Sequence, residues 1–454
     1  MKKNFIVIIA GLLHSICIFS YSLESKIRAN ISLTDSAIDL PLAFKMDVKN
    51  EFILSSYDED TLFLKLNTLP KIPAAQIGIQ HLKITTEGNK PVPYSFNGSI
   101  LAIYIHDKNT HFTIEYEILG QNILGTFSSD NFLISEVYNS MSASWYFTHE
   151  KMHISPIEIT IPPNATLFSN TTMLKNGNNS YLLGISHEDD VKLLVISNRF
   201  YNMFSNKIVN TSYNLYLHNT KELDICPDAS KTDTLINKLC SKEQYGEEYF
   251  KDKIQKYNNC IKKVNSFFNL KDTIFFNIIE FHWGNGSIAN GASFSTYMLI
   301  DTSFIKGSGF IHEYIHIIDP LNEYYQTADS AKYLFSESMI EYLSHYIFYY
   351  DDLSSRDYIE NTRMVYYSKE NQKYTSIFQV RENIPETQPI IYSRTPFVIK
   401  EFALKVGEKI FTNALMEFYK LAKNKETVSL NDFVNILQSN GVNETDINEF
   451  INQL

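Results

Sequence analysis

The chain has 454 residues, of which 44% are hydrophobic, and its formal net charge at pH 7 is −11. This length can form two or three domains with large cores, and the composition is that of a folded globular protein. The acidic balance, with no cluster of basic residues, argues against a nucleic-acid partner and against binding to an anionic membrane surface.

The first 22 residues have the pattern of a secretory signal peptide. Lys2 and Lys3 precede an apolar run from Phe5 to Phe19, and Ser20 and Ser22 supply the small residues of a cleavage site. We expect cleavage after Ser22 and export to the periplasm or the extracellular medium. Because the run is too short for a comfortable membrane span, we expect no stable membrane insertion after cleavage.

Residues 23–222 are predicted to form an all-β domain. Apolar and polar residues alternate in the segments 112–118, 157–161 and 213–217, which is the period of half-buried strands. Short alternating strands with polar turns between them predict a β-sandwich-like domain. The segment contains no convincing catalytic cluster, so a general role in packing or carbohydrate contact remains an alternative to a role beside an active site.

From residue 223 onward the pattern becomes mostly helical, after one or two strands. Apolar residues from Phe250 to Phe268 recur at helical spacing, and the run Ile274–Phe281 is typical of a strand. Glu280 and His282 stand at the end of this run, where we expect edge or rim positions and not metal ligands.

The last third of the chain carries regular helix signals. Gly407 and Gly441 are expected to end helices, and Ser429 and Thr445 are expected to cap the two that follow.

Three cysteines remain after the predicted cleavage. Cys226 and Cys240 close the shortest loop, so in an exported chain they are the expected disulfide. Cys260 is then expected to be a buried thiol on a helix. None of the three has the spacing of a metal site.

His312-Glu313-Tyr314-Ile315-His316 is the segment in which residue identity and spacing together point to a chemistry. Histidines four apart lie above one another on a helix face, so both imidazoles can bind one metal ion while Glu313 stays beside it. This is the HExxH arrangement of zinc peptidases. Composition alone gives such a match in roughly a few per cent of chains of this length, so two ordinary helix histidines are the alternative.

A second helix is predicted over Ala331–Tyr350, and it carries Glu337, Glu341 and His345 at successive four-residue steps. A catalytic zinc takes three protein ligands and leaves one position for water, so Glu337 is the expected third ligand. Glu341 either orients a ligand histidine or belongs to a solvated helix face. With the triad complete, His345 is expected to be structural.

These segments resemble the gluzincin zinc metallopeptidases of the aminopeptidase N and glycyl aminopeptidase families. The stretch 337–342, Glu-Ser-Met-Ile-Glu-Tyr, is similar to their Glu-Gly-Phe-x-x-Tyr segment, and His-Glu-Tyr-Ile-His is similar to their His-Glu-Tyr-Phe-His form. The resemblance implies an α+β protein in which residues 223–454 form a thermolysin-like zincin catalytic domain, mostly helical towards the C-terminus. It also implies one Zn²⁺ bound by His312, His316 and Glu337.

The resemblance extends to the stretch 392–396, Tyr-Ser-Arg-Thr-Pro, which is similar to the families' Tyr-x-x-Gly block. In those enzymes the tyrosine stabilises the oxyanion, so the resemblance implies this role for Tyr392. Tyr366 and Tyr367 are the alternative candidates. Gly291 and Ala292 are expected to lie in an edge strand whose backbone pairs with an extended substrate.

Two departures from the families bear on specificity. Their Gly-x-Met-Glu-Asn segment places a glutamate on the free amino terminus of the substrate, whereas residues 290–296 here contain no acid. Glu280 is the only acid nearby that would substitute. Glu341 stands where the aminopeptidases usually have a small residue, and it resembles the carboxylate that orients a ligand histidine in thermolysin-like enzymes.

The expected function is that of a secreted zinc peptidase that acts on a peptide or protein substrate, as an endopeptidase or as a relaxed aminopeptidase. Glu313 would activate a zinc-bound water for peptide-bond hydrolysis. The alternative is a catalytically inactive, zinc-binding secreted interaction protein with the same fold. An intact Glu313 argues against that alternative, and nothing in the sequence indicates an oligomeric state.

Overall fold

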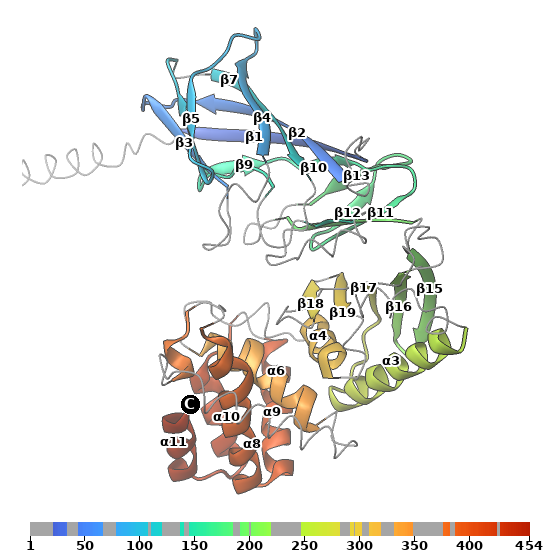
Figure 1. Ribbon diagram of the computed structural model, residues 1–454. Coiled ribbons are helices and arrows are strands. Elements are labelled where there is room, and N and C mark those ends of the chain that lie inside the picture. The colour runs from blue at the N-terminus through green and yellow to red at the C-terminus, as the bar shows by residue number, and fades with distance from the viewer. Residues whose placement is uncertain are drawn as a thin grey trace, which may run out of the picture. The chain divides into compact units, whose positions relative to one another are not determined.

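The structure is a computed structural model with two compact units, which are taken here one at a time (Figure 1). It describes residues 21–33, 44–66, 79–107, 110–119, 137–139, 145–184, 191–198, 201–218, 247–281, 291–294, 296–301, 308–318, 331–347, 376–381, 386–424 and 427–454. The apolar run of the predicted signal peptide, Cys226, Cys240, His282, Tyr366 and Tyr367 lie outside these residues.

The first unit holds the described residues up to Asn202, and its described elements are strands. They are β1 (Ser22–Leu33), β2 (Phe44–Ser55), β3 (Thr61–Lys65), β4 (Ile79–Thr86), β5 (Tyr94–Phe96), β6 (Ile100–Tyr104), β7 (Thr110–Leu119), β8 (Val137–Asn139), β9 (Met152–Ile154), β10 (Ile157–Thr160), β11 (Ala165–Ser169), β12 (Met173–Lys175), β13 (Ser180–Leu183), β14 (Leu193–Ser197) and, at the boundary, the first two residues of β15 (Tyr201–Ile208).

The strands of this unit form one eight-stranded sheet and two three-stranded sheets. The large sheet has the order β12-β13-β10-β1-β2-β7-β4 with β9 beside β1, and the small ones are β11-β14-β8 and β3-β6-β5. In β1, Leu23, Ile27 and Ile31 are buried while Glu24 and Lys26 are exposed, which is the two-residue period of a strand with one buried face. Buried residues of all three sheets belong to one hydrophobic core. The N-terminal region is therefore rich in sheet, as the alternation predicts.

The predicted cleavage after Ser22 falls at the start of β1. Ser22 pairs with Ser55 of β2, and the hydroxyl of Tyr21 lies 3.1 Å from Nε2 of His149. Cleavage at that point would remove both residues from these contacts.

The second unit holds the described residues from 203 onward. Its elements are β15, β16 (Thr211–His218), α3 (Glu247–Phe267), β17 (Ile274–Phe281), β18 (Gly291–Phe294), β19 (Tyr297–Asp301), α4 (Ser308–Ile318), the π-helical segments η5 (Leu334–Ser338), η6 (Leu343–Ile347) and η8 (Ile390–Arg394), α6 (Met339–Tyr342), the 3₁₀ turn η7 (Ile377–Gln379), α8 (Thr395–Val406), α9 (Glu408–Ala422), α10 (Leu430–Ser439) and α11 (Glu444–Gln453).

A five-stranded sheet in the order β15-β16-β17-β19-β18 opens the second unit. β16, β17 and β19 run parallel, and β18 runs antiparallel to β19 at the edge. Because β15 and β16 belong to this sheet, the first unit ends at Asn202, whereas the alternation pattern continues to residue 222. A strand pattern does not show which sheet a strand joins.

Helices complete the second unit and share its hydrophobic core with the sheet. Gly407, with φ 97°, ends α8, and Ser429 forms a capping box with Asp432 at the start of α10, as predicted. Asn443, not the predicted Thr445, caps α11, because its side chain accepts the N–H of Asp446. Figure 1 shows α8, α9, α10 and α11 gathered at the C-terminal end of the unit.

None of the helices that the structure describes is long and apolar enough to cross a membrane. Cys260 lies on α3 with a free thiol, half-buried, and burial raises its pKa to about 11.

Candidate metal centre

Helix α4 presents the HExxH segment from the interior of the second unit. Phe310, Ile311, Tyr314 and Ile315 are almost completely buried in the hydrophobic core, so their burial fixes the rotation of the helix about its axis. The opposite face then carries the two histidines and Glu313, all with little exposure. Helix α4 contacts the edge strand β18, the neighbouring β19 and α3.

Three side chains converge on one point beside this helix. Nε2 of His312 lies 3.0 Å from Nε2 of His316, and Oε2 of Glu337 lies 3.4 Å from the first and 3.6 Å from the second. One ligand atom from each residue lies within 4.8 Å of the other two. Among the described residues, this is the group of histidine and acidic side chains that is spaced to hold a metal ion.

Glu341 lies directly behind the converging atoms. Its Oε2 is 2.8 Å from Nδ1 of His312, and its Oε1 is 2.9 Å from Nε2 of His345. The side chains of Glu341 and His345 are each only 7% exposed. Glu341 thus lies in the interior and not on a solvated helix face. His345 is in contact with the site through Glu341, a role that its four-residue spacing from Glu341 allows but does not require.

Tyr392 approaches the same point from another helix. Its hydroxyl donates to Oε2 of Glu337 over 3.0 Å, and its ring centroid lies 6.1 Å from that of His312. Tyr392 is on η8, which runs directly into α8.

Glu337, His345 and Tyr392 each lie on a π-helical segment, namely η5, η6 and η8. Such segments are rare and occur often at functional sites, because one inserted residue turns the neighbouring side chains to a new direction. The sequence predicts one continuous α-helix over Ala331–Tyr350, and its apolar spacing contains no sign of these insertions.

The electrostatics of the site favour a cation. Burial lowers the pKa of His312, but the carboxylates of Glu337 and Glu341 outweigh it and raise that pKa well above 6.5. Burial raises the pKa of Glu337, and the charges of His316 and His312 reverse the effect and hold it well below 4.5. The same negative potential that retains a proton on His312 would stabilise a metal ion in its place. Two imidazoles and one carboxylate are an established zinc ligand set, so the donors fit Zn²⁺.

Glu313 is 7% exposed and lies beside the three donors without being one of them. Burial raises the pKa of its carboxyl group above the usual 4.5, against the opposing charges of His312 and His316. The carboxyl also accepts a hydrogen bond from the side chain of Ser293, on β18. Sequence reasoning did not single out Ser293, because only the packing of α4 against β18 brings the two residues together.

Gly291 and Ala292 lie in β18, where they pair with Ile300 and Leu299 of β19. β18 has no partner on its other side among the strands that the structure describes. The predicted edge strand is therefore present and lies against the helix of the HExxH segment.

Glu280 is not the rim residue that the sequence pattern predicts. It lies on β17, between β16 and β19, and is 2% exposed. Its Oε1 forms an ion pair with Lys253, which is 1% exposed, and accepts a hydrogen bond from Tyr257 over 3.1 Å. Glu280 is buried although it stands near the end of an apolar run, because α3 covers this part of the sheet. Glu280 is thus committed to α3 and is a poor substitute for the missing amine-binding acid.

Replacing Glu280 with Gln is expected to lower the free energy of unfolding by about 3–5 kcal/mol, because Lys253 would remain buried without its counter-charge. Denaturant unfolding followed by circular dichroism measures the change. Glu449→Gln is the control, since Glu449 pairs with Lys405 at the surface with 53% of its side chain exposed, and we expect no measurable change there. Equal stability of the Glu280 variant and the wild type would contradict the buried pair.

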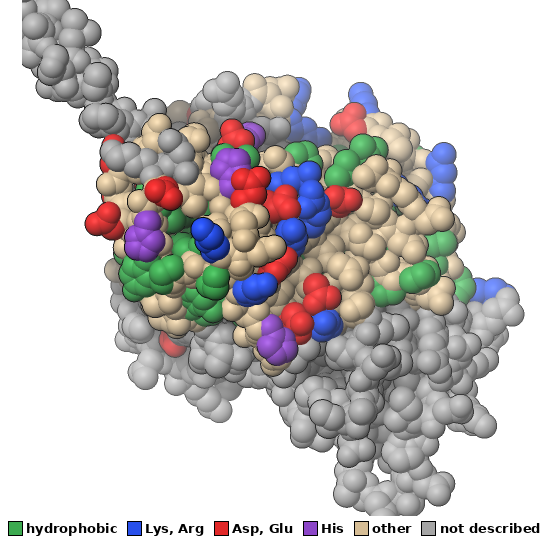
Figure 2. All heavy atoms as spheres, turned by 90° about the horizontal axis from the view of Figure 1, so that it is seen from above, with side chains coloured by type: hydrophobic (Ala, Val, Ile, Leu, Met, Phe, Trp, Pro, Cys, Tyr) green, Lys and Arg blue, Asp and Glu red, His purple; other side chains and the backbone are tan. Residues whose placement is uncertain are grey.

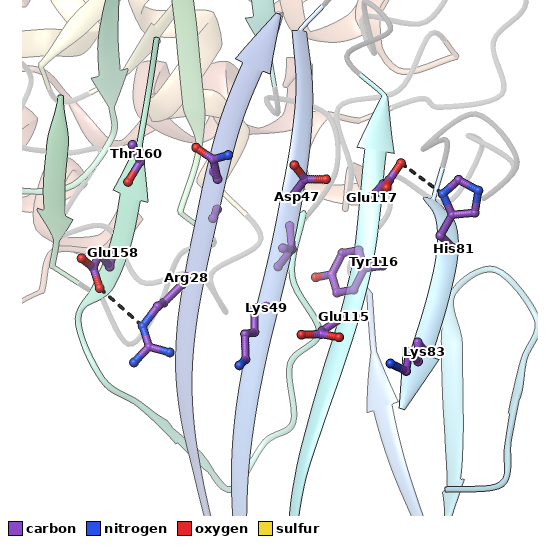
Figure 3. Close-up of a pocket in the computed structure, with 13 residues that line it drawn as sticks. Arg28, Asp47, Lys49, His81, Lys83, Glu115, Tyr116, Glu117, Glu158 and Thr160 are labelled. Atoms are coloured by element: carbon purple, nitrogen blue, oxygen red, sulfur yellow. Dashed lines mark ion pairs between the residues drawn. The ribbon is translucent and has the colours of Figure 1, made fainter. Parts of the chain in front are cut away.

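A concave region lies on the polar face of the eight-stranded sheet in the first unit, with a volume of ≈ 460 Å³. Figure 3 shows that cations and carboxylates alternate across it, with Arg28 paired to Glu158 and His81 to Glu117. Figure 2 likewise shows acidic and basic side chains mixed over the face that it displays. This alternation is what the polar face of a half-solvated sheet carries, and it selects no ligand charge.

No family model matches the sequence, and no curated protein matches it significantly. Solved structures do match. An aminopeptidase N family protein from Idiomarina loihiensis is 12% identical, with a TM-score of 0.63 over 93% of this chain and 75% of that one. Aminopeptidase A from Legionella pneumophila is 12% identical, with a TM-score of 0.50 over 97% of this chain and half of that one. An M1 zinc metallopeptidase from Deinococcus radiodurans is 9% identical, with a TM-score of 0.49 over 95% and 94% of the two chains. The first two matches show that the chain has the fold of these two aminopeptidases.

Proposed function

We propose that the protein is an exported zinc peptidase, with one Zn²⁺ bound by His312, His316 and Glu337. The observation that carries the proposal is the convergence of these three ligand atoms within 4.8 Å beside the buried carboxyl group of Glu313. The fold it shares with zinc aminopeptidases supports the reaction class. Export is proposed from the pattern of the first 22 residues alone.

The chain's own residues account for most of the proposed chemistry. Bound zinc would polarise the scissile carbonyl and acidify a water molecule. Glu313 would take a proton from the attacking water and deliver it to the leaving amine, and burial suits this task by raising the pKa of its carboxyl group. Glu341 would hold His312 in one orientation through its contact with Nδ1. Gly291 and Ala292 would pair with the substrate backbone through the free edge of β18.

Two measurements on the wild-type protein test the proposal. Metal analysis is expected to find one zinc per chain, and digestion of an unbiased peptide library is expected to give cleavage that a chelator stops. A zinc-loaded protein that cuts no member of the library would instead identify a binding protein without turnover.

Replacing Tyr392 with Phe is expected to lower kcat by roughly ten- to a thousandfold, because it removes one hydrogen-bond donor from the oxyanion. Zinc content should stay unchanged, since the hydroxyl contacts Glu337 only as a donor. Steady-state kinetics with parallel metal analysis measures both quantities. Unchanged turnover in this variant, with a loss in Tyr366→Phe or Tyr367→Phe, would transfer the role.

Peptides with an acetylated amino terminus are expected to be cut with kcat/KM values similar to those of the free peptides. Binding an ammonium group in a desolvated cleft requires a carboxylate, because an unpaired buried charge costs several kcal/mol. The stretch 290–296 has no acid, and Glu280 is already paired with Lys253. Mass spectrometry of matched peptide pairs makes the comparison. Hydrolysis that stops on acetylation would show aminopeptidase specificity and require another acid at the site.

A further inference from the structure

Ser338 connects the helix that carries Glu337 to the helix that carries Tyr392. Its side chain is completely buried, and its hydroxyl donates to the backbone carbonyl of Ile391 over 2.6 Å. The neighbouring residues make a second link: Glu337 precedes Ser338, Tyr392 follows Ile391, and the hydroxyl of Tyr392 donates to Glu337 over 3.0 Å. Two adjacent hydrogen bonds therefore join η5 to η8.

The carbonyl of Ile391 accepts this bond because of the local backbone pattern. In the π-helical segment η8, the N–H of Thr395 donates to the carbonyl of Ile390, five residues earlier. By the same five-residue pattern, the carbonyl of Ile391 would accept a hydrogen bond from the N–H of residue 396. That residue is proline, which has no N–H to donate. Ser338 supplies the donor that Pro396 lacks.

The resulting bond acts on the position of Tyr392. A buried carbonyl strongly favours a conformation in which it has a donor, so the hydroxyl of Ser338 fixes the backbone of residue 391 against η5. Tyr392 follows directly in the chain, and its hydroxyl must meet an oxyanion within hydrogen-bond distance to be effective. The similar segment Glu-Gly-Phe-x-x-Tyr has glycine where this chain has Ser338, so the link through the serine hydroxyl is a departure from that pattern.

We propose that Ser338 is a positioning residue for the peptidase reaction, which sets Tyr392 relative to Glu337 by satisfying the carbonyl that Pro396 leaves without a donor. The inference rests on the proposed function, because it assumes that Tyr392 acts on the oxyanion. Ser338 itself touches neither substrate nor zinc in this assignment.

The central experiment is a double-mutant cycle between Ser338→Ala and Tyr392→Phe in the zinc-loaded full chain. Ser338→Ala alone is expected to lower kcat by about ten- to a hundredfold, as misplacement of a catalytic group does, with KM and zinc content near wild type. In the Tyr392→Phe background, the same change should have little further effect on kcat, because the hydroxyl it positions is already absent.

Two further variants separate positioning from general destabilisation. Pro396→Ala restores a backbone N–H, so Ser338→Ala is expected to cost less kcat in that background than in the wild type. This double variant also retains a donor for Ile391 should the single alanine variant fail to fold. Ser344→Ala is the matched control. Ser344 is equally buried and donates to a backbone carbonyl, that of Glu341, over 3.0 Å. The fold-losses in kcat from Ser344→Ala and Tyr392→Phe should multiply in the double variant.

The outcomes separate the two proposals. If Tyr392→Phe lowers kcat but the effect of Ser338→Ala multiplies with it, Ser338 is only structural and the proposed function stands. If Tyr392→Phe has no effect, the oxyanion role fails and the positioning role fails with it. A folded, zinc-loaded Ser338→Ala protein with wild-type kcat also overturns the inference.

Discussion

Replacing Glu313 with Gln is expected to lower peptide hydrolysis by about 10²–10⁴-fold while the zinc content remains at one per chain. The size of the loss is that of removing a general base from its reaction. Zinc should be retained because Glu313 lies beside the three converging donors and is not one of them. The amide is close in shape to the carboxyl group, and its NH₂ group cannot take up a proton from water at neutral pH.

Initial rates on a fluorogenic peptide, with metal analysis of the same samples, measure this pair of effects. Glu401→Gln, an exposed substitution on α8, controls for the change of charge and should leave the rate unaltered. Loss of zinc in the Glu313 variant would mean that the residue belongs to the ligand set. Retained zinc with full activity would remove Glu313 from the mechanism.

Zinc binding is expected to fall in a graded order when the residues around the site are changed. His312→Ala and Glu337→Gln should each leave substoichiometric zinc after gel filtration and abolish hydrolysis, since a tetrahedral site loses one of its three protein ligands. Glu341→Gln should keep zinc but weaken its affinity by roughly 10–100-fold, as loss of a partner of a ligand histidine does. Competition with a chromophoric chelator gives the affinities.

The expected order follows from the position of each oxygen. Oε2 of Glu337 lies within 3.6 Å of Nε2 of both ligand histidines. Glu341 contacts His312 at Nδ1, on the far side of the ring from those atoms. Full zinc retention in both His312→Ala and Glu337→Gln proteins would contradict the ligand assignment. A Glu341 variant as depleted as the Glu337 variant would place both carboxylates on the metal.

The parts of the site that depend on helix geometry can be predicted from the sequence. His312 and His316 share a face because residues four apart do so in any α-helix. The zinc site needs a third protein ligand, and Glu337 on the next predicted helix was the candidate before any resemblance was considered. That its carboxylate meets both histidines depends on how the two helices pack, which their sequences do not show. The contact of Glu341 with His345 joins residues four apart on one helix, which the spacing allows, whereas its contact with His312 needed the packing of two helices.

The sequence was least informative about what lies next to a strand. Glu280 stands near the end of an apolar run, and the run alone does not show that Lys253 of α3 covers this end of the strand. The predicted boundary at residue 222 was drawn from alternation alone, and β15 and β16 have the same alternation as the strands before them although they pair within the second unit. Sheet membership depends on pairing with distant residues, such as that of Thr211 with Ile274, and alternation within a strand carries no information about it.

The place of β1 inside the eight-stranded sheet has a consequence for the order in which the protein is made. Among the strands that the structure describes, β1 is synthesised first, yet its neighbours are β2 on one side and β9 and β10 on the other, with Arg28 opposite Glu158. Until β10 emerges, one edge of β1 offers unpaired backbone groups to other chains. Closing so long a loop is slow, so this edge of β1 stays open to pairing with other chains for most of the synthesis of this unit.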